Sequence, residues 1–290
     1  MTTEQKINPD ADGLIVGNPD VTTAEEIAAF RAYYDRTKGR VLPGFEFLLE
    51  HRPDVLKRYR AGVRVTTSPE WRSHPLQMVL QHLHQYVISA YGDGIIYQVH
   101  VAQNAGASKA MVLDVLSIAF LHSGPRGLNY AATEAGDYIR DYADPAPGKW
   151  PEGWGFEANA FHSGMDFASP GASNADIDAL RDWHMRTTGE IPKHVDYLAK
   201  YSPDLLKAWR NRYEHCIRAL PKQMMPYLLL NYNVSRGFAD GIRENVLLGK
   251  AFGMTKQQLT DPIAWSLYYG GVESYDLIER VVGDVLDSMR

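Results

Sequence analysis

The stretch DGIIYQVHVAQNAGAS, residues 93–108, returns later in the chain as DGIRENVLLGKAFGMT, residues 240–255. The offset is 147 residues throughout, for example from Gly106 to Gly253. Each stretch predicts a helix that ends at this glycine, because glycine adopts the left-handed backbone conformation at no steric cost. The serine or threonine two residues later predicts the cap of a second helix. The chain therefore carries a helix, turn and helix unit twice.

The duplication extends well beyond this unit. At an offset of 150 residues three further pairs of segments match: 27–31 with 177–181, 36–39 with 186–189, and 53–57 with 203–207. Internal repetition of this kind predicts that the same structural unit occurs twice in the fold. We predict an N-terminal arm over residues 1–22, a first repeat over 23–142, a linker over 143–172 and a second repeat over 173–290. The two repeats should form a pseudo-symmetric pair.

Helical periodicity in both repeats predicts an all-α fold. Apolar residues recur at i, i+3 and i+4 steps, as in the segment 76–90, and we find no run that alternates as a strand would. Thr23 and Thr255 each precede a Glu or Gln three residues later, which predicts a capping box. Pro262 follows in the helix that Thr255 caps. Because proline removes a backbone hydrogen bond, we expect a kink there or a helix that restarts at Asp261-Pro262.

Two segments outside the repeats lack helical periodicity. Residues 1–22 are polar and contain Gly13, Gly17 and Pro19, which predicts a loose arm. Residues 143–172 are rich in Pro, Gly and aromatic residues. A connection of this length is unusual in a compact protein and is often functional. It either holds the two repeats together or covers a pocket.

The composition bounds the class of protein. The net charge of the 290 residues is −5 and they contain no basic cluster, so we expect no nucleic-acid partner. The single Cys216 cannot form an intrachain disulfide or a redox pair. No apolar run is long enough to span a membrane, and the polar start is not typical of a signal peptide. We expect a cytoplasmic protein with no membrane partner.

No motif in the sequence predicts a cofactor or a metal. A Gly-rich phosphate loop, a nucleophile elbow and a cofactor-binding lysine motif are all missing. His82 and His84 lie two residues apart on a predicted helix, roughly opposite each other, so they cannot hold one metal ion from that helix. We expect no nucleotide, flavin, pyridoxal or metal cofactor.

The paired helices and the turns Gly106-Ala107-Ser108 and Gly253-Met254-Thr255, each followed by an amphipathic helix, identify a resemblance. Both repeats resemble the AhpD-like superfamily, which contains alkylhydroperoxidase D and carboxymuconolactone decarboxylase. The resemblance covers about 230 residues and leaves the arm and the linker outside it. It implies an all-helical fold, obligate oligomers, and sites between helices at a subunit or repeat interface.

This sequence departs from the peroxidase branch of that superfamily, which carries a CxxC and a His eight residues before the turn glycine. The positions that correspond are Tyr91, Gly94 and Gln98 in the first repeat and Phe238, Gly241 and Asn245 in the second. Since a thiolate is the nucleophile of dithiol chemistry, a thiol peroxidase is excluded. The decarboxylase branch resembles the peroxidase branch in carrying a His at this position. Here an amide side chain, Gln98 or Asn245, stands there in both repeats, and an amide cannot act as a general base. Gln98 is therefore assigned to substrate binding.

The central helix of the first repeat carries candidate catalytic residues. Four polar side chains share one stripe at i, i+4, i+7 and i+11: Asp93, Tyr97, His100 and Asn104. A histidine titrates near neutral pH, so His100 is a candidate proton shuttle. The second repeat keeps Asp240 and Glu244 on this stripe but has Leu247 in place of the histidine. The alternative is a solvated helix face, with Asp93 bonded to a neighbouring helix.

A second set of candidates follows the next helix. His122 and Arg126 flank a Gly-Pro break, and a His and an Arg at a helix end can bind a carboxylate. The counterpart of His122 in the second repeat is Tyr269. A surface loop is the alternative. The 17 tyrosines, several of them near the central motif, suit a planar aromatic ligand.

These features predict a cofactor-independent enzyme of the lyase, decarboxylase or isomerase type, acting on a small aromatic or lactone-type carboxylic acid. The residues assigned to catalysis are His100, Tyr97 and His122, and those assigned to substrate binding are Arg126, Asp93, Gln98 and Tyr269. The alternative is a non-catalytic ligand-binding or assembly protein of the same fold. Because the helices carry wide apolar faces, we expect a homo-oligomer.

Overall fold

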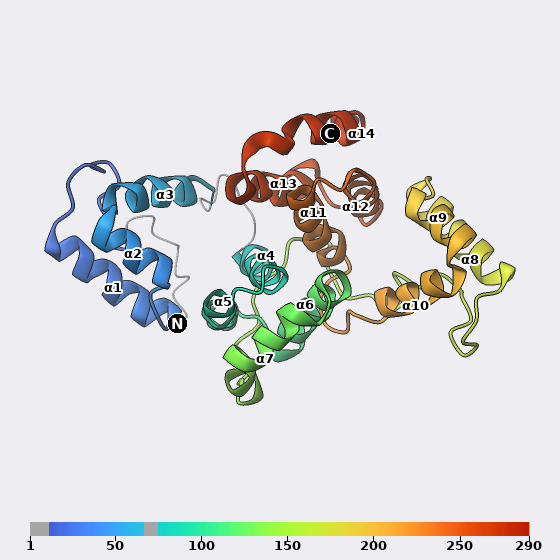
Figure 1. The fold of residues 1–290 in the computed structure, drawn as a ribbon, viewed down its shortest axis with the longest axis horizontal. Helices are drawn as coiled ribbons and strands as arrows, with labels where there is room; N and C mark the ends of the chain where they lie inside the picture. Colours follow the sequence, from blue (N-terminus) through green and yellow to red (C-terminus); the bar gives the residue numbers. More distant parts are fainter. Residues whose placement is uncertain (1–11, 67–74, 290) are drawn as a thin grey trace. The chain divides into compact units, whose positions relative to one another are not determined.

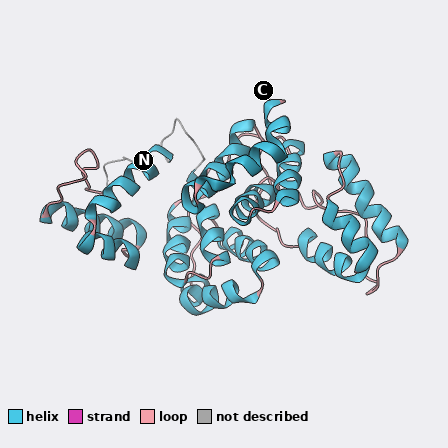
Figure 2. Cartoon of the chain, turned by 45° about the horizontal axis from the view of Figure 1, so that its top comes forward, coloured by secondary structure: helices cyan, strands magenta, loops and turns pink. Residues whose placement is uncertain are grey.

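The computed structural model describes residues 12–66 and 75–289, and every regular element in these ranges is a helix (Figures 1 and 2). There are 14 α-helices, one short 3-10 helix and no strand in the described ranges, so the all-α prediction is confirmed. The chain forms two compact units. Unit 1 comprises the described residues up to Lys109 together with 129–149, and unit 2 comprises 110–128 and 150–290. Residues 110–128, which we assigned to the first repeat, thus belong to unit 2.

Unit 1 is built on a pair of packed helices, α4 and α5, with α1 against α5 and α2 against α3. Its helices are α1 (Ala24–Lys38), α2 (Pro43–His51), α3 (Pro53–Thr66), α4 (Pro75–Ile88), α5 (Gly92–Asn104) and most of α7 (Pro125–Arg140). The predicted capping box of Thr23 is present, and α1 ends at Gly39 with a left-handed φ of 76°. Local sequence therefore sets the two ends of α1.

Unit 2 is centred on α11, which packs on both α12 and α13. Its helices are α6 (Lys109–Ser123), α8 (Asn174–Thr188), α9 (Lys193–Tyr201), α10 (Pro203–Glu214), α11 (Met224–Arg236), α12 (Ala239–Ala251), α13 (Lys256–Gly270), the 3-10 helix η1 (Val272–Ser274) and α14 (Tyr275–Asp287). Helices α8 and α14 pack against α12, and α9 packs against α10. A separate apolar cluster joins α8, α9 and α10: Met165, Ile177, Leu180, Val195 and Leu206.

The repeated Asp-Gly-Ile motif has a packing role at the start of α5 and α12. A Cβ on Gly94 would lie 2.4 Å from the ring of Tyr91, and one on Gly241 would lie 2.6 Å from the ring of Phe238. Glycine at this position therefore lets the aromatic side chain three residues earlier fold over the helix start. The predicted turn glycines also behave as expected, since Gly106 has a φ of 93°.

The expected restart at Asp261-Pro262 is wrong, because α13 runs unbroken from Lys256 to Gly270. Pro262 lies in the second turn of this helix, so only one backbone hydrogen bond is lost. The Pro262 carbonyl accepts a hydrogen bond from the Ser266 hydroxyl at 2.8 Å, a contact that adds to the helix just after the proline.

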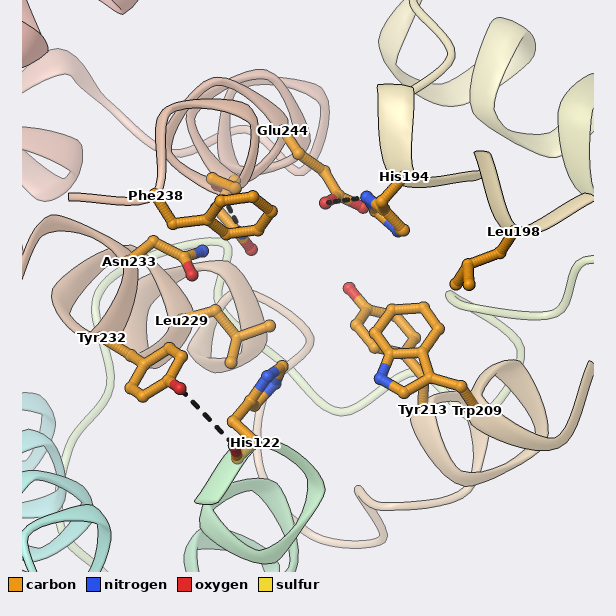
Figure 3. Close-up of a pocket in the computed structure, with 12 residues that line it drawn as sticks. His122, His194, Leu198, Trp209, Tyr213, Leu229, Tyr232, Asn233, Phe238 and Glu244 are labelled. Carbon is orange, nitrogen blue, oxygen red and sulfur yellow. Dashed lines mark hydrogen bonds and ion pairs between the residues drawn. The ribbon is translucent and has the colours of Figure 1, made fainter. Parts of the chain in front are cut away.

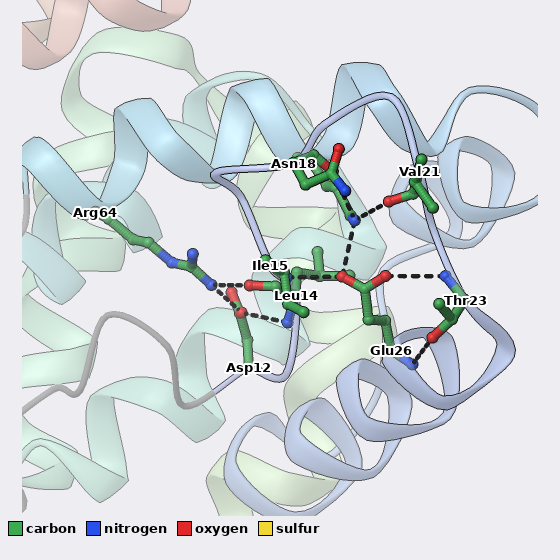
Figure 4. Close-up of polar contacts among 9 residues, drawn as sticks. Asp12, Leu14, Ile15, Asn18, Val21, Thr23, Glu26 and Arg64 are labelled. Carbon is green, nitrogen blue, oxygen red and sulfur yellow. Dashed lines mark hydrogen bonds and ion pairs between the residues drawn. The ribbon is translucent and has the colours of Figure 1, made fainter.

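The loose arm expected over residues 1–22 is wrong for residues 12–22, while residues 1–11 lie outside the described part of the chain. Asp12 and Leu14 are buried. The Asp12 carboxylate pairs with Arg60 at 2.8 Å. Figure 4 shows its second pair, with Arg64. A buried carboxylate is stable only when paired, so these contacts hold the segment on α3.

The linker is divided between the two units, and each part packs on its own unit. In unit 1 the Gly148 N–H donates to the Gly106 carbonyl at 3.0 Å. In unit 2 Trp154 and Phe161 are buried, and the Lys222 N–H donates to the Gly155 carbonyl at 3.0 Å. The linker is therefore tied to the backbone of unit 1 and contributes buried aromatic side chains to the core of unit 2.

A buried ion pair joins the first and third of three consecutive helices in each unit, α1 to α3 in unit 1 and α8 to α10 in unit 2. Lys57 lies 2.7 Å from Glu26, and Lys207 lies 3.0 Å from Asp176. In both pairs the carboxylate also completes the capping box of its helix, shown for Glu26 and Thr23 in Figure 4. Each lysine donates to a backbone carbonyl of the preceding segment as well. One charged pair thus joins three segments of chain.

Lys207→Met should lower the free energy of unfolding by about 3–5 kcal/mol, because it leaves the Asp176 carboxylate buried and unpaired. Urea unfolding followed by circular dichroism measures the change. Lys193→Met is the matched control, since Lys193 is 87% exposed and lies 3.5 Å from Asp240. Exposed pairs contribute about 0–1 kcal/mol. Equal losses in the two variants would contradict a stabilising role for the buried pair.

Candidate functional site

Unit 2 contains a cavity of about 320 Å³. Helices α6, α9, α10, α11 and α12 supply its lining (Figure 3). The lining residues are His122, His194, Leu198, Trp209, Tyr213, Leu229, Tyr232, Asn233, Phe238, Gly241, Glu244 and Asn245. The volume lies at the small end of the range for small-molecule sites. No lining residue comes from the linker, so the linker does not cover this cavity.

Aromatic rings form two walls of the cavity. Trp209 and Tyr213 lie four residues apart on α10 and so share one face, with ring centroids 5.2 Å apart. Phe238 and Tyr232 lie on the other side of the cavity in Figure 3. The cavity thus offers flat apolar surfaces, which suit a planar ligand.

An acid–base pair stands at one end of the cavity. Nδ1 of His194 on α9 lies 3.9 Å from Oε2 of Glu244 on α12, and the two side chains are 22% and 13% exposed. Burial raises the pKa of the Glu244 carboxyl, and the nearby Asp240 charge adds to the rise, while His194 and Arg210 oppose it. Glu244 therefore keeps its proton to a higher pH than a solvated glutamate does.

His122 points into the cavity from the end of α6, on the side away from Glu244 (Figure 3). Its ring centroid lies 5.4 Å from that of Tyr232. Burial lowers the pKa of His122 to about 4, and the charge of Arg212 lowers it further. His122 is therefore an uncharged imidazole at neutral pH, with one N–H to donate and one nitrogen to accept.

Several buried polar atoms of the residues that line the cavity make no hydrogen bond to the described protein. They are Nε2 of His122, both ring nitrogens of His194, and Oδ1 of Asn245. The amide nitrogen of Asn245 is already used, since it donates to the Gly241 carbonyl at 2.8 Å. Buried polar atoms in native proteins almost always have a partner. This arrangement is therefore suited to a ligand that both donates and accepts hydrogen bonds.

The structure places Tyr97 and His100, two residues that we assigned to catalysis, in unit 1. Tyr97 is buried and its ring stacks on that of Tyr34 at 6.3 Å. Nδ1 of His100 lies 2.9 Å from the hydroxyl of Tyr138. Burial, and then the charge of Lys38, lowers the pKa of His100. His122 belongs to unit 2, so the structure does not bring the three residues together in one unit.

The residues assigned to substrate binding have other contacts or positions. Asp93 pairs with Arg40, which lies in the loop between α1 and α2 and not on a neighbouring helix. The Gln98 amide donates to the Val79 carbonyl at 3.0 Å and so joins α5 to α4.

The other two residues assigned to substrate binding lie in unit 2. Arg126 is exposed on α7 and does not line the cavity. Tyr269 lies in α13, and its side chain is outside the described part of the structure. Arg126, the residue expected to recognise a carboxylate from the loop after α6, is therefore not among the described residues that line the cavity.

Sequence reasoning did not assign Glu244, His194 or Trp209 to the site. Glu244 carried a signal, because it stands 147 residues after Tyr97 on the matched helical stripe. On that stripe Leu247 stands in place of the histidine, and the residues assigned to catalysis lie in the first repeat. His194 carried no signal, since its counterpart at an offset of 150 residues is Gly44.

The described residues contain no group of three or more His, Cys, Asp or Glu side chains that could hold a metal ion. Within the same ranges, no helix combines the length and the apolar character needed to cross a membrane. Comparison with known proteins adds no assignment, because no family model, no curated protein and no solved structure matches this chain. The candidate site is therefore judged on its own residues.

Gly241→Ala should lower the free energy of unfolding by about 1–3 kcal/mol, the usual range for overpacking. The added Cβ would stand 2.6 Å from Nδ2 of Asn233 and 2.6 Å from the ring of Phe238, so both side chains must move. Thermal unfolding measures the change. Gly136→Ala is the control, since nothing lies within 4 Å of that position on α7. Alanine there should raise stability by up to about 1 kcal/mol, and a similar gain at position 241 would contradict the close packing.

Proposed function

We propose that this protein is a cofactor-independent acid–base enzyme, and that the cavity of unit 2 is its active site. The proposal places it in the lyase, decarboxylase or isomerase class, acting on a small aromatic or lactone-type molecule. One observation carries it: the buried Glu244 carboxyl, beside His194, faces a small cavity with aromatic walls. A carboxyl group with a raised pKa in a cleft is typical of a catalytic acid or base.

Glu244 is the proposed general base. In its ionised form it removes a proton from a carbon next to a carbonyl group of the ligand, and it later returns the proton. General acid–base catalysis is most efficient when the pKa of the catalytic group lies near the working pH. Burial of Glu244 moves its pKa in that direction.

The negative charge that develops on the ligand oxygen needs hydrogen-bond donors. His122 supplies one from the side away from Glu244, as an uncharged imidazole. The Asn233 side chain lines the same cavity and carries an amide group. Donors that are already in position stabilise such a charge without a cost for reorganisation.

We further infer that the chain contains two AhpD-like repeats, because their helices correspond in length. Helices α1 and α8 have 15 residues each, α2 and α9 have nine, and α5 and α12 have 13. The ion pairs of Lys57 and Lys207 also match at an offset of 150 residues. On this alignment Glu244 stands where the first repeat has Tyr97, which supports a catalytic site in the second repeat.

Glu244→Gln should slow proton exchange by about 10²–10⁴-fold, the usual contribution of a general base. The measurement is the NMR-detected exchange of C–H for C–D in a panel of small cyclic ketones and lactones in D₂O. Mass spectrometry of molecules that co-purify with the protein would extend the panel. The substitution keeps the shape of the side chain and removes a buried charge, so the variant should fold.

His100→Leu is the matched control for this experiment. It removes the sequence-predicted base of unit 1 and should leave the exchange rate unchanged. Loss of exchange in His100→Leu with full exchange in Glu244→Gln would move the site to unit 1. Ligand binding without exchange in the parent protein would favour the non-catalytic alternative.

The exchange rate should rise with pH and level off above the pKa of Glu244, because only the ionised carboxylate accepts a proton. Since burial raises that pKa above its ordinary 4.5, the midpoint should lie above pH 4.5. His122 titrates at about pH 4 and so does not define this limb. The pH profile of the rate tests the assignment. A rate that falls as the pH rises from 4.5 to 7 would contradict it.

A further inference from the structure

We infer that the cavity of unit 2 selects uncharged ligands, a planar ring bearing a hydroxyl, amide or carbonyl group, and rejects carboxylates and ammonium ions of the same shape. This inference rests on the proposed function for the location of the site. It replaces the carboxylic acid that the sequence suggested with a neutral molecule.

The first observation is that no lining residue of the cavity is a lysine or an arginine. A carboxylate that leaves water for such a cavity loses its hydration and gains no cationic partner. It would also lie near the Glu244 carboxyl. Like charges close together in a partly buried site oppose each other strongly.

The arginines nearest the cavity are already engaged. Arg210 is buried, donates to Glu214 at 2.9 Å and to the Phe161 carbonyl at 2.6 Å, and stacks on the ring of Trp183 at 4.1 Å. Its guanidinium is therefore paired and fixed. It cannot turn toward a ligand without breaking a buried ion pair.

Arg212 is also directed elsewhere. It donates to the Phe120 carbonyl at 3.1 Å and lies over the Phe120 ring at 4.8 Å. His122 supplies no charge at neutral pH, because burial keeps its imidazole neutral. Neither arginine is therefore placed to receive an anion in the cavity, and His122 offers it no charge.

The second observation concerns the polar atoms that lack partners. Oδ1 of Asn245 is an acceptor, and Nε2 of His122 either donates or accepts. A neutral hydroxyl or amide group both donates and accepts, so it matches this pair. An ammonium group only donates, so it offers no acceptor when Nε2 of His122 is the donor. The unpartnered atoms thus favour a neutral polar group over a cation.

Two pairs of probes with matched shapes test the inference. Benzamide and benzoate differ mainly in charge, and so do benzyl alcohol and benzylammonium. Isothermal titration calorimetry at pH 7 should show benzamide binding at least about tenfold more tightly than benzoate, since a tenfold ratio needs only a modest electrostatic penalty. Benzyl alcohol should bind more tightly than benzylammonium.

Glu244→Gln should reduce the preference for benzamide over benzoate by about tenfold, because it removes the negative charge that repels the anion. Leu198→Trp, at a partly exposed position of the lining, should abolish binding of both neutral probes by filling the cavity. Retained binding in Leu198→Trp would show that the probes bind elsewhere and would overturn the inference.

Tighter binding of benzoate or of benzylammonium than of its neutral partner would also overturn the inference, as would the absence of benzamide binding at millimolar concentration. These outcomes are separate from those of the exchange experiment. A preference for neutral probes without proton exchange would leave the inference standing and remove only the catalytic proposal. Proton exchange together with a preference for benzoate would overturn the inference and leave the catalytic proposal standing.

Discussion

The buried pair of a lysine and a carboxylate at the start of α1 and of α8 is the interaction on which the architecture of each unit depends. Glu26 and Asp176 cap their own helices and pair with Lys57 and Lys207 from the third helix of the set. Since a buried charge is costly without its partner, the preceding segment, the first helix and the third helix are fixed together. In unit 2 the third helix is α10, and it carries Trp209 into the wall of the cavity.

The cavity depends on a second constraint, the close approach permitted by Gly241. Phe238 folds over the first turn of α12, and the Asn233 side chain of α11 approaches from the neighbouring helix. One turn later on the same face of α12 stands Glu244, whose side chain is 13% exposed. Burial raises its pKa, and burial in the same place would also deprive a charged ligand of hydration. The acid–base chemistry and the preference for a neutral ligand that we propose thus have one physical origin.

The two units use similar helices for different purposes. In unit 1 the polar residues of α5 are engaged within the fold: Asp93 pairs with Arg40, and Gln98 bonds the backbone of α4. In unit 2 the corresponding helix presents Glu244 to a cavity. At an offset of 147 residues, Glu244 stands where the first stretch has Tyr97, so the two helices present different side chains at corresponding positions.

The sequence by itself determined the helices, their caps and their turn glycines, because these depend on contacts within about four residues along the chain. The capping boxes of Thr23 and Thr255 and the left-handed turn at Gly106 were all readable in this way. Only the tertiary structure decided that residues 110–128 belong to unit 2 and that Asp12 is buried. It also decided the site, since His194 and Glu244 are 50 residues apart in the sequence and meet only when α9 and α12 pack in one unit. Local hydrogen bonds leave a pattern in the sequence, whereas burial and long-range pairing arise only once the chain has folded.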